Sequence, residues 1–225
     1  MAPSSSGAVL FDIDGTLVDS NYLHVVAWTQ AFRTVKHPVD GVRIHRGVGM
    51  GSDELLDSLL GSELATTLGD RLRDEHRENY ARMRDQLRPF DGARELVAAV
   101  GRRATAVLAT SASSEELDAL LEVLDLGSAV AAVTSAKDVE AAKPHPDLVE
   151  VALDRAGVGP DRAVFVGDTV WDVEASGRAG VTCVGVLSGG ISEAELRDAG
   201  AVAVYPDAGA ILADLDRSPL KAVLA

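Results

Sequence analysis

The stretch that decides the fold covers residues 8–19 and reads Ala8-Val9-Leu10-Phe11-Asp12-Ile13-Asp14-Gly15-Thr16-Leu17-Val18-Asp19. It begins with a short apolar run that ends abruptly in acids and glycine, a pattern typical of a buried parallel strand. In open α/β sheets, ligands bind at the carboxyl edge of the strands. The stretch therefore predicts that Asp12 and Asp14 lie at a binding edge, where one carboxylate attacks or holds a metal and the other exchanges protons.

Two other interpretations of this acidic pair remain open on the stretch alone. Asp and Gly are ordinary turn residues, so Asp12 and Asp14 would merely begin a turn. The Asp-X-Asp metal site of sugar-nucleotide transferases also joins two acids to a strand end. Neither interpretation predicts the functional groups that follow later in the chain.

Composition and charge limit the class of protein. A chain of 225 residues with 47% hydrophobic and 25% charged residues can bury a substantial core, as one large domain or as a core with a modest insertion. The formal net charge of -14 disfavours nucleic acid and anionic membranes as partners, and an anionic substrate would need local cations or a metal. The segment from Arg33 to Arg46 is locally basic, although a solvated helix end and loop would have the same composition.

Cysteine usage and the first residues bear on the compartment. The single cysteine, Cys183, lies in an apolar run and has no partner for an intramolecular disulfide, so we expect a small core residue and a reducing compartment. Residues 1–6 lack the charged start and apolar segment of a signal peptide, and no apolar run is long enough to span a bilayer. The default expectation is a cytoplasmic protein.

Short β-like runs alternate with helical patterns along most of the chain. This alternation implies parallel βαβ units with helices on both faces of the sheet, and it predicts a doubly wound α/β core. The expected strands are Ala8–Phe11, Ala104–Ala109, Ala129–Thr134, Ala163–Val166, Val181–Leu187 and Ala201–Val204. The expected helices include Ala93–Val100, Glu115–Leu124, Asp147–Ala156 and Glu193–Ala199.

The alternation stops early in the chain, where helical periodicity dominates over Tyr22–Val35, Asp53–Leu60 and Glu63–Leu87. Because the chain leaves one strand and reaches the next only at Ala104, this block is predicted to be a small, inserted, all-helical cap domain. The predicted organisation is a core of residues 1–18 and 91–225, with a cap of residues 19–90.

The two ends of this insertion lie next to the expected binding edge. They would act as hinges, and closure of the cap would exclude water and complete the site. At the other end of the chain, residues 216–225 have a weak pattern and are expected to fray.

Two later strand ends carry groups that a phosphoryl-transfer site needs. One is followed by Thr110-Ser111-Ala112-Ser113-Ser114, which offers hydroxyls and backbone N–H groups before a helix, as a phosphate cradle does. Plain N-capping by Ser113 or Ser114 is the alternative. Lys143-Pro144 follows another strand. A lone lysine is usually a solvated surface charge, but beside paired carboxylates it would neutralise crowded negative charge.

A third strand ends in Gly167-Asp168, with Asp172 about one helical turn further on. Gly167 lets the backbone approach closely, Asp168 can ligate a hard cation, and Asp172 would face back toward the site. The alternative is that Asp168 caps a helix whose first turn contains Asp172. Oxygen ligands without a His or Cys cluster suit Mg²⁺ better than zinc, so we prefer the magnesium interpretation.

Taken in order, these motifs resemble those of the haloacid dehalogenase superfamily. They are Asp12-Ile13-Asp14-Gly15-Thr16, Ser111, Lys143-Pro144, and Gly167-Asp168 with Asp172, within a resemblance that covers about Ala8 to Val186. The helical insertion between the first two motifs resembles that of the phosphoglycolate phosphatase and β-phosphoglucomutase-like branch.

The resemblance implies a role for each motif residue. Asp12 would be the nucleophile that forms an aspartyl-phosphate, and Asp14 would protonate the leaving oxygen and then activate water. Ser111 would bind the phosphoryl group, Lys143 would pair with Asp12 and phosphate, and Asp172 would orient Lys143. Mg²⁺ would be held by Asp12, the Asp14 backbone carbonyl and Asp168, which together with Lys143 would offset repulsion between carboxylate and phosphate.

The acid at position 14 favours phosphate-ester chemistry, because dehalogenases and phosphonate-cleaving members of the superfamily lack it. We therefore predict a Mg²⁺-dependent phosphatase that acts on a small phosphorylated metabolite, as a monomer or homodimer. The substrate is chosen mainly by the cap. We expect contacts from Thr16, Ala112, His24 and Arg46, with Met50 and Ser52 on the same surface and with Trp28 and Trp171 either lining the cleft or packing.

Two alternative functions stay open. Sugar-phosphate mutases of the β-phosphoglucomutase type carry a histidine near the first hinge, as this chain does with His24, and a loop similar to Ser111-Ala112-Ser113. They hold the distal phosphate with an arginine where this chain has Met50, although Arg46 would compensate. A phospho-receiver module also combines acids and a lysine on an α/β sheet, but it leaves the inserted helices unexplained.

Overall fold

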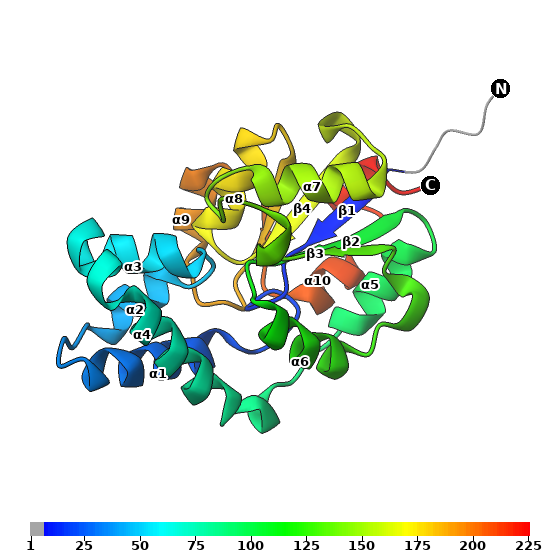
Figure 1. Ribbon diagram of the computed structural model, residues 1–225. Coiled ribbons are helices and arrows are strands. Elements are labelled where there is room, and N and C mark those ends of the chain that lie inside the picture. Colours follow the sequence, from blue (N-terminus) through cyan, green and yellow to red (C-terminus); the bar gives the residue numbers. More distant parts are fainter. Residues whose placement is uncertain (1–6) are drawn as a thin grey trace.

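The computed structural model describes residues 7–225, and in this part of the chain six parallel strands form one sheet (Figure 1). Their order across the sheet is β3-β2-β1-β4-β5-β6, so the first strand lies at the centre. The strands are β1 (Ala8–Phe11), β2 (Thr105–Ala109), β3 (Ala132–Thr134), β4 (Ala163–Gly167), β5 (Thr182–Val186) and β6 (Ala203–Tyr205). All six predicted strands are confirmed.

Strand β1 is buried on both faces because helices cover the sheet on each side. Alternate residues of β1 pack into two separate apolar clusters, with Val9 and Phe11 in one and Ala8 and Leu10 in the other. The first cluster includes α5 (Ala93–Gly101), α6 (Ser114–Leu124) and α10 (Ala208–Ala213); the second includes α7 (Asp147–Ala156), α8 (Val170–Arg178) and α9 (Glu193–Ala199). The predicted doubly wound α/β fold is confirmed.

A helical insertion, made of four helices, lies between β1 and β2 and extends beyond the carboxyl edge of the sheet (Figure 1). Its own apolar cluster is built from Trp28, Phe32, Ile44, Leu56 and Leu72, together with smaller neighbours. The helices are α1 (Asn21–Thr34), α2 (Gly41–Gly47), α3 (Ser52–Leu60) and α4 (Ser62–Ala81). The sequence pattern did not predict α2. Only one of its apolar side chains, that of Ile44, is buried.

The chain enters and leaves the helical insertion through two segments that lie side by side. Val18 forms an antiparallel bridge with Pro89, and the Asp19 N–H donates to the Arg88 carbonyl at 2.9 Å. The Phe90 N–H donates to the Leu17 carbonyl, also at 2.9 Å. The insertion is therefore joined to the sheet through one narrow, hydrogen-bonded connection.

Short 3₁₀ turns and the last residues complete the structure. The prediction that residues 216–225 fray is wrong, because Leu220 and Val223 are buried in the first apolar cluster and the Val223 carbonyl accepts from the Gly7 N–H at 2.9 Å. Cys183 is buried, as predicted, and burial raises the pKa of its thiol to about 12. The 3₁₀ turns are Arg84–Gln86, Gly127–Ala129, Ala136–Asp138, Pro160–Arg162 and Pro219–Ala222.

Across residues 7–225, we find no helix with both the length and the apolar character that crossing a bilayer requires.

The separate apolar cluster of the helical insertion predicts a local stability effect. Leu72 of α4 is fully buried in that cluster, whereas Leu64 of the same helix is 38% exposed. Truncation of Leu72 leaves a cavity, so Leu72→Ala should lower the free energy of unfolding by about 2–5 kcal/mol. Leu64→Ala, the matched control, should change it by less than about 1 kcal/mol. Urea unfolding measures both values, and equal effects would contradict the assigned packing.

Candidate active site

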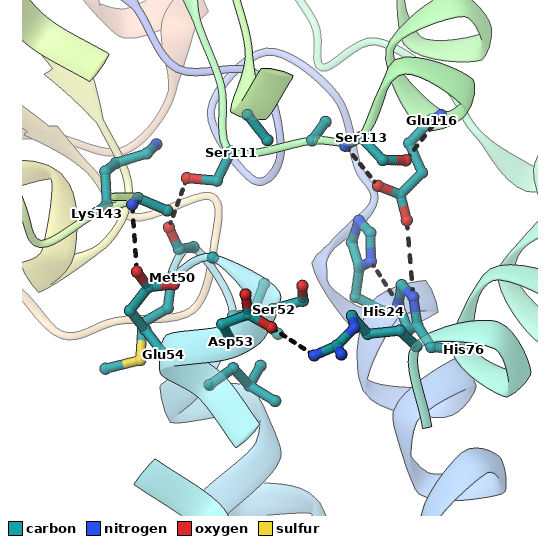
Figure 2. Close-up of a pocket in the computed structure, with 18 of the residues that line it drawn as sticks. His24, Met50, Ser52, Asp53, Glu54, His76, Ser111, Ser113, Glu116 and Lys143 are labelled. Atoms are coloured by element: carbon teal, nitrogen blue, oxygen red, sulfur yellow. Dashed lines mark hydrogen bonds and ion pairs between the residues drawn. The ribbon is translucent and has the colours of Figure 1, made fainter. Parts of the chain in front are cut away.

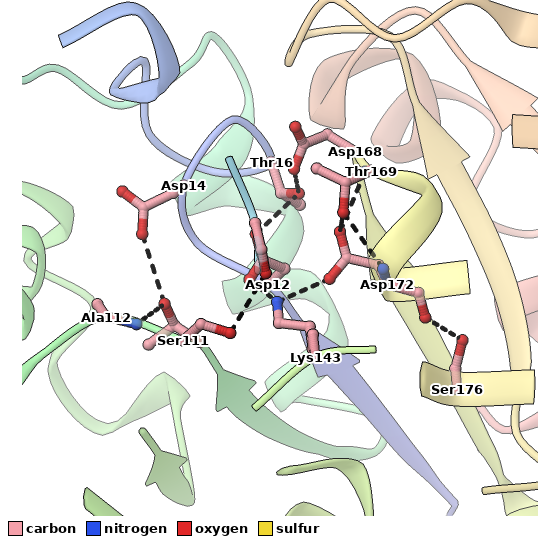
Figure 3. Close-up of polar contacts among 12 residues, drawn as sticks. Asp12, Asp14, Thr16, Ser111, Ala112, Lys143, Asp168, Thr169, Asp172 and Ser176 are labelled. Atoms are coloured by element: carbon pink, nitrogen blue, oxygen red, sulfur yellow. Dashed lines mark hydrogen bonds and ion pairs between the residues drawn. The ribbon is translucent and has the colours of Figure 1, made fainter. Parts of the chain in front are cut away.

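Three neighbouring strands deliver acidic and hydroxyl side chains to one point on the sheet edge (Figure 3). Asp12 follows β1, Asp168 follows β4, and Thr110 and Ser111 follow β2. Because β2, β1 and β4 are adjacent and parallel, their carboxyl ends meet. The loop after β3 brings Lys143 to the same place.

Lys143 is the centre of the site, and its ammonium group lies between two carboxylates. Its Nζ is 2.5 Å from Asp12 Oδ1 and 2.7 Å from Asp172 Oδ1. The three side chains are between 0% and 5% exposed. Burial alone would lower the pKa of Lys143, but the charges and hydrogen bonds of Asp12 and Asp172 reverse this and raise it far above its usual value.

Asp172 is fixed by the beginning of α8. Its Oδ2 accepts from the backbone N–H of Thr169 at 3.0 Å and from the Thr169 hydroxyl at 2.6 Å, while the Thr169 Oγ1 accepts from the Asp172 N–H at 3.2 Å. This capping box satisfies one carboxylate oxygen of Asp172 and leaves the other for Lys143. The first turn of α8 therefore orients Lys143 through Asp172.

Asp168, which lies near both Asp12 and Asp172, is tightly enclosed by backbone and side chains. Its Oδ1 accepts from the Thr16 hydroxyl at 3.0 Å, and its Oδ2 accepts from Asn21 Nδ2 at 2.8 Å. A Cβ added to Gly15 would lie 2.4 Å from Asp168 Oδ2, and one added to Gly189 would lie 1.6 Å from it. Only glycine permits the backbone to come this close.

The site has an excess of negative charge that a cation would balance. Ligand oxygens of Asp12, Asp168 and Asp172 lie within 4.8 Å of one another, and one ammonium group faces these three carboxylates. Burial, against the opposing effect of Lys143, raises the pKa of Asp12 well above its usual value; burial and the Asp172 charge raise the pKa of Asp168 to about 8. A divalent cation would neutralise the excess charge, and an all-oxygen donor set suits Mg²⁺.

Asp14 points away from Asp12 and has a different set of partners. Its Oδ1 accepts from the Ser20 hydroxyl at 2.6 Å and lies 3.3 Å from His24 Nε2, and its Oδ2 accepts from the Thr110 hydroxyl at 3.4 Å. Burial would raise the pKa of Asp14, but the hydrogen bonds and charge of His24, with the Ser20 bond, hold it below its usual value. The pKa values of the two carboxylates are thus shifted in opposite directions, upward for Asp12 and downward for Asp14.

A cavity of about 720 Å³ opens over these groups, between the sheet edge and the helical insertion (Figure 2). Asp12, Asp14 and Lys143 line its floor, together with the loop of Ser111 and Ala112. The helical insertion contributes the opposite wall, which includes His24, Trp28, Met50, Ser52 and His76. The Ser111 hydroxyl donates to the Gly49 carbonyl at 3.3 Å, so the insertion touches the floor.

Most of the predicted site residues are brought together, but two of the expected substrate contacts are not on the cavity wall. Thr16 is fully buried and bonds to the carboxylates of Asp168 and, at 3.5 Å, Asp12. Arg46 lies outside the cavity, because α2 directs its guanidinium to Glu195 of α9. The structure does not support a substrate contact for Arg46.

The two tryptophans also differ in their position relative to the cavity. Trp28 lines the cavity, whereas Trp171 lies near Arg46, and its Nε1 donates to the Arg46 carbonyl at 2.9 Å.

Among the residues that contact the acidic groups or line the cavity, the sequence did not predict Ser20, Asn21, His76 or Glu116. Ser20 and Asn21 sit next to the first motif, so their position was a usable signal. His76 lies in a highly charged helix and Glu116 in an ordinary capping pattern, and no local feature of the sequence distinguishes either of them.

Comparison with known proteins identifies the family of the chain. The chain matches the model of the haloacid dehalogenase-like hydrolase family over residues 9–186. It is 30% identical over 186 residues to an N-acetylmuramic acid 6-phosphate phosphatase of Pseudomonas aeruginosa, covering 81% of this chain and 82% of that protein. It is 30% identical over 204 residues to the phosphoglycolate phosphatase of Escherichia coli strain K12, covering 80% and 81%.

A solved structure is similar over nearly the whole chain. A hydrolase from Pseudomonas syringae is 34% identical, with a TM-score of 0.89 over 93% of this chain and 98% of that one. The ordered motifs, the doubly wound sheet and these matches lead to one conclusion: the chain belongs to the haloacid dehalogenase-like hydrolase family.

Proposed function

We propose that this protein is a Mg²⁺-dependent phosphatase that hydrolyses a small phosphate monoester through an aspartyl-phosphate on Asp12. The observation that carries the proposal is the buried contact of Lys143 with Asp12 and Asp172 on the floor of the cavity. An ammonium group held there offsets the repulsion that a carboxylate nucleophile meets at a phosphate. The phosphatase names of the relatives support the reaction class.

In the proposed first step, Asp12 attacks phosphorus and the bond to the alcohol oxygen breaks. Oδ2 of Asp12 is the proposed nucleophile, because Oδ1 is held by Lys143 at 2.5 Å, whereas Oδ2 has the long contact with the Thr16 hydroxyl at 3.5 Å. Ser111, on the cavity floor, would bind the transferring phosphoryl group and would exchange its contact with the Gly49 carbonyl for a phosphate oxygen. The alcohol leaves with a proton, and the phosphoryl group remains on Asp12.

Asp14 is the proposed acid and base. The hydrogen bonds from Ser20 and His24 occupy its Oδ1, so its Oδ2 is the oxygen placed to exchange the proton. A bound phosphate adds negative charge nearby and raises the pKa of Asp14, which lets the carboxyl carry the proton that the leaving alcohol needs. The resulting carboxylate then takes a proton from water, which attacks the aspartyl-phosphate and releases phosphate.

The residues that would hold Mg²⁺ are Asp12, Asp168 and the backbone carbonyl of Asp14. The ion would supply positive charge at the phosphoryl oxygens. The tight backbone around Asp168 and the excess of negative charge fit this assignment.

We also propose that residues 19–90 act as a cap whose closure excludes water. The narrow connection at Val18 and Pro89 would be its hinge. In this arrangement the helical insertion supplies the wall that selects the leaving group, which places substrate choice on residues such as Met50 and Ser52.

The mutase alternative has less support from the cavity. A mutase must hold a second phosphate at the far end of its substrate. Arg73 and Arg77 of α4 line the cavity, but Arg73 is paired with Asp53 and Asp70, and Arg77 is paired with Asp74. These pairs reduce the positive charge available to a distal phosphate, which favours a phosphatase.

Replacement of the nucleophile tests the reaction class. Purified protein should release inorganic phosphate from at least one member of a panel of phosphate monoesters, and only with Mg²⁺ present. Asp12→Asn should lower turnover by about three orders of magnitude or more, because the amide cannot form the acyl phosphate. Asp118→Asn, at an exposed position of α6, is the matched control. Equal release by both variants would reject the proposal.

Replacement of the acid and base separates binding from turnover. Asp14→Asn should remain folded and lower kcat by about 10²- to 10⁴-fold, because general acid–base catalysis is lost. Its KM should change little. Steady-state kinetics on the substrate found above measures both constants, and an unchanged kcat would remove the role given to Asp14.

Metal binding is testable without turnover. Mg²⁺ at about one hundred times its Kd should stabilise the native protein by about 2.7 kcal/mol, a rise in Tm of roughly 5–10 °C. Asp168→Asn should lose most of this increment, because it removes a ligand and half of the local excess charge. Differential scanning calorimetry with and without Mg²⁺ gives the increment, and an equal rise in both proteins would place the ion elsewhere.

A further inference from the structure

A chain of polar contacts links Asp14 to the helical insertion through His24. Figure 2 shows its continuation from His24 to His76 and Glu116. His24 of α1 contacts Asp14 Oδ1 through Nε2 at 3.3 Å, and its Nδ1 lies 3.1 Å from His76 Nε2 of α4. The other nitrogen of His76, Nδ1, lies 3.6 Å from Glu116 Oε1 of α6. Two histidines therefore connect the proposed acid and base to a carboxylate on another element.

The two imidazole rings are held in fixed orientations by aromatic neighbours. His24 stacks on Tyr80, with ring centroids 4.2 Å apart, and His76 stacks on Trp28 at the same distance. The side chains of His24 and His76 are 12% and 8% exposed, and that of Glu116 is 10% exposed. A buried ring that is clamped in this way keeps its nitrogens pointed at its partners.

The positions of the hydrogens on the two imidazole rings define the role of Glu116. Asp14 Oδ1 accepts from His24 Nε2, and Glu116 Oε1 lies within ion-pair distance of His76 Nδ1, so these two ring nitrogens carry hydrogens. The 3.1 Å contact between His24 Nδ1 and His76 Nε2 holds one further hydrogen. The two rings therefore share three hydrogens and one positive charge, which the carboxylates of Asp14 and Glu116 offset. Glu116 thus decides which nitrogen of His76 carries its hydrogen, and through it sets the hydrogen bond that His24 makes to Asp14.

Glu116 is also fixed to the sheet edge. Its Oε2 accepts from the Ser113 N–H at 2.9 Å, and the Ser113 Oγ accepts from the Glu116 N–H at 3.4 Å. This capping box begins α6 two residues after Ser111. The polar chain therefore starts and ends on loops of the sheet edge but passes through α1 and α4 of the helical insertion.

We propose that Glu116 and His76 are positioning residues for Asp14, which hold His24 against its Oδ1 and leave Oδ2, whose contact is the long bond from Thr110, to exchange the proton with the leaving group. This proposal rests on the function proposed above. Because the chain needs α1 and α4 seated against α6, proton transfer is available only when the helical insertion is in place over the cavity.

The test uses Glu116→Gln and His76→Phe in the full chain. Glutamine also serves in a capping box, so the start of α6 is kept, and phenylalanine keeps an aromatic ring against Trp28. Each protein is assayed on glycerol phosphate, whose alcohol needs a proton to leave, and on p-nitrophenyl phosphate, whose phenolate leaves without one. Glu115→Gln, an exposed neighbour with the same charge change, is the matched control.

Both test variants should lose about 10- to 100-fold in kcat/KM on the alkyl ester and less than about threefold on the aryl ester. Equal losses on the two esters would show that the residues act only on folding or binding, and no loss on either would show that Asp14 does not need them. Both results overturn the proposal. A wild-type protein that releases phosphate from neither ester, nor from any other monoester, would instead overturn the proposed function.

A measurement that needs no turnover gives an independent check. Nitrogen-15 NMR of the histidine rings distinguishes protonated from unprotonated ring nitrogens. In the native protein His76 Nδ1 should carry a hydrogen, and in Glu116→Gln it should not, because the amide can donate to Nδ1. The two rings then share only two hydrogens, on His24 Nε2 and His76 Nε2, because the third is lost together with the charge of Glu116. An unchanged His76 signal would overturn the proposal that Glu116 sets which nitrogen of His76 carries the hydrogen.

Discussion

The structure depends on one buried ammonium group that holds together carboxylates from distant parts of the chain. Lys143 joins Asp12, at the end of the central strand, to Asp172, in the first turn of α8. Removing the Lys143 charge would leave both carboxylates buried without a charged partner, which typically costs about 3–5 kcal/mol. The same arrangement keeps three carboxylates close together, so the site is stable as a unit but remains short of positive charge.

That shortage connects the fold to its chemistry. Strand β1 is buried on both faces, and its end delivers Asp12 where β2 and β4 also end. A carboxylate placed there is dehydrated, and burial raises its pKa unless cations approach. A phosphate brings more negative charge to the same point, so the site can accept it only when positive charge accompanies it. The lysine supplies part of that charge, and a divalent ion would supply the rest.

The sequence predicted the parts of this arrangement that local patterns control. The strand ends that carry Asp12, Asp168 and Ser111 follow from short apolar runs, and the ordered motifs identified Lys143 and Asp172. The position of Arg46 was beyond such reasoning, because the short helix α2 at Gly41–Gly47 directs its side chain toward Glu195. His76 and Glu116 were also hidden, since their proximity depends on how α4 packs against α1 and α6, which no local pattern specifies.

The contacts between the helical insertion and the sheet edge are of two kinds, and their arrangement supports the proposed opening of the site. Near the connection, Ala27 and Tyr80 join the apolar cluster of the sheet with Val18 and Leu87. Further away the contacts are polar, such as His45 Nε2 with the Gly189 carbonyl at 2.9 Å and the Ala142 N–H with Glu54 Oε1 at 3.2 Å. Water can replace each polar contact at small net cost, whereas separating the apolar surfaces is unfavourable. Apolar contacts therefore anchor the insertion near its connection to the sheet, whereas the polar contacts further away can break. The proposed hinge requires this arrangement.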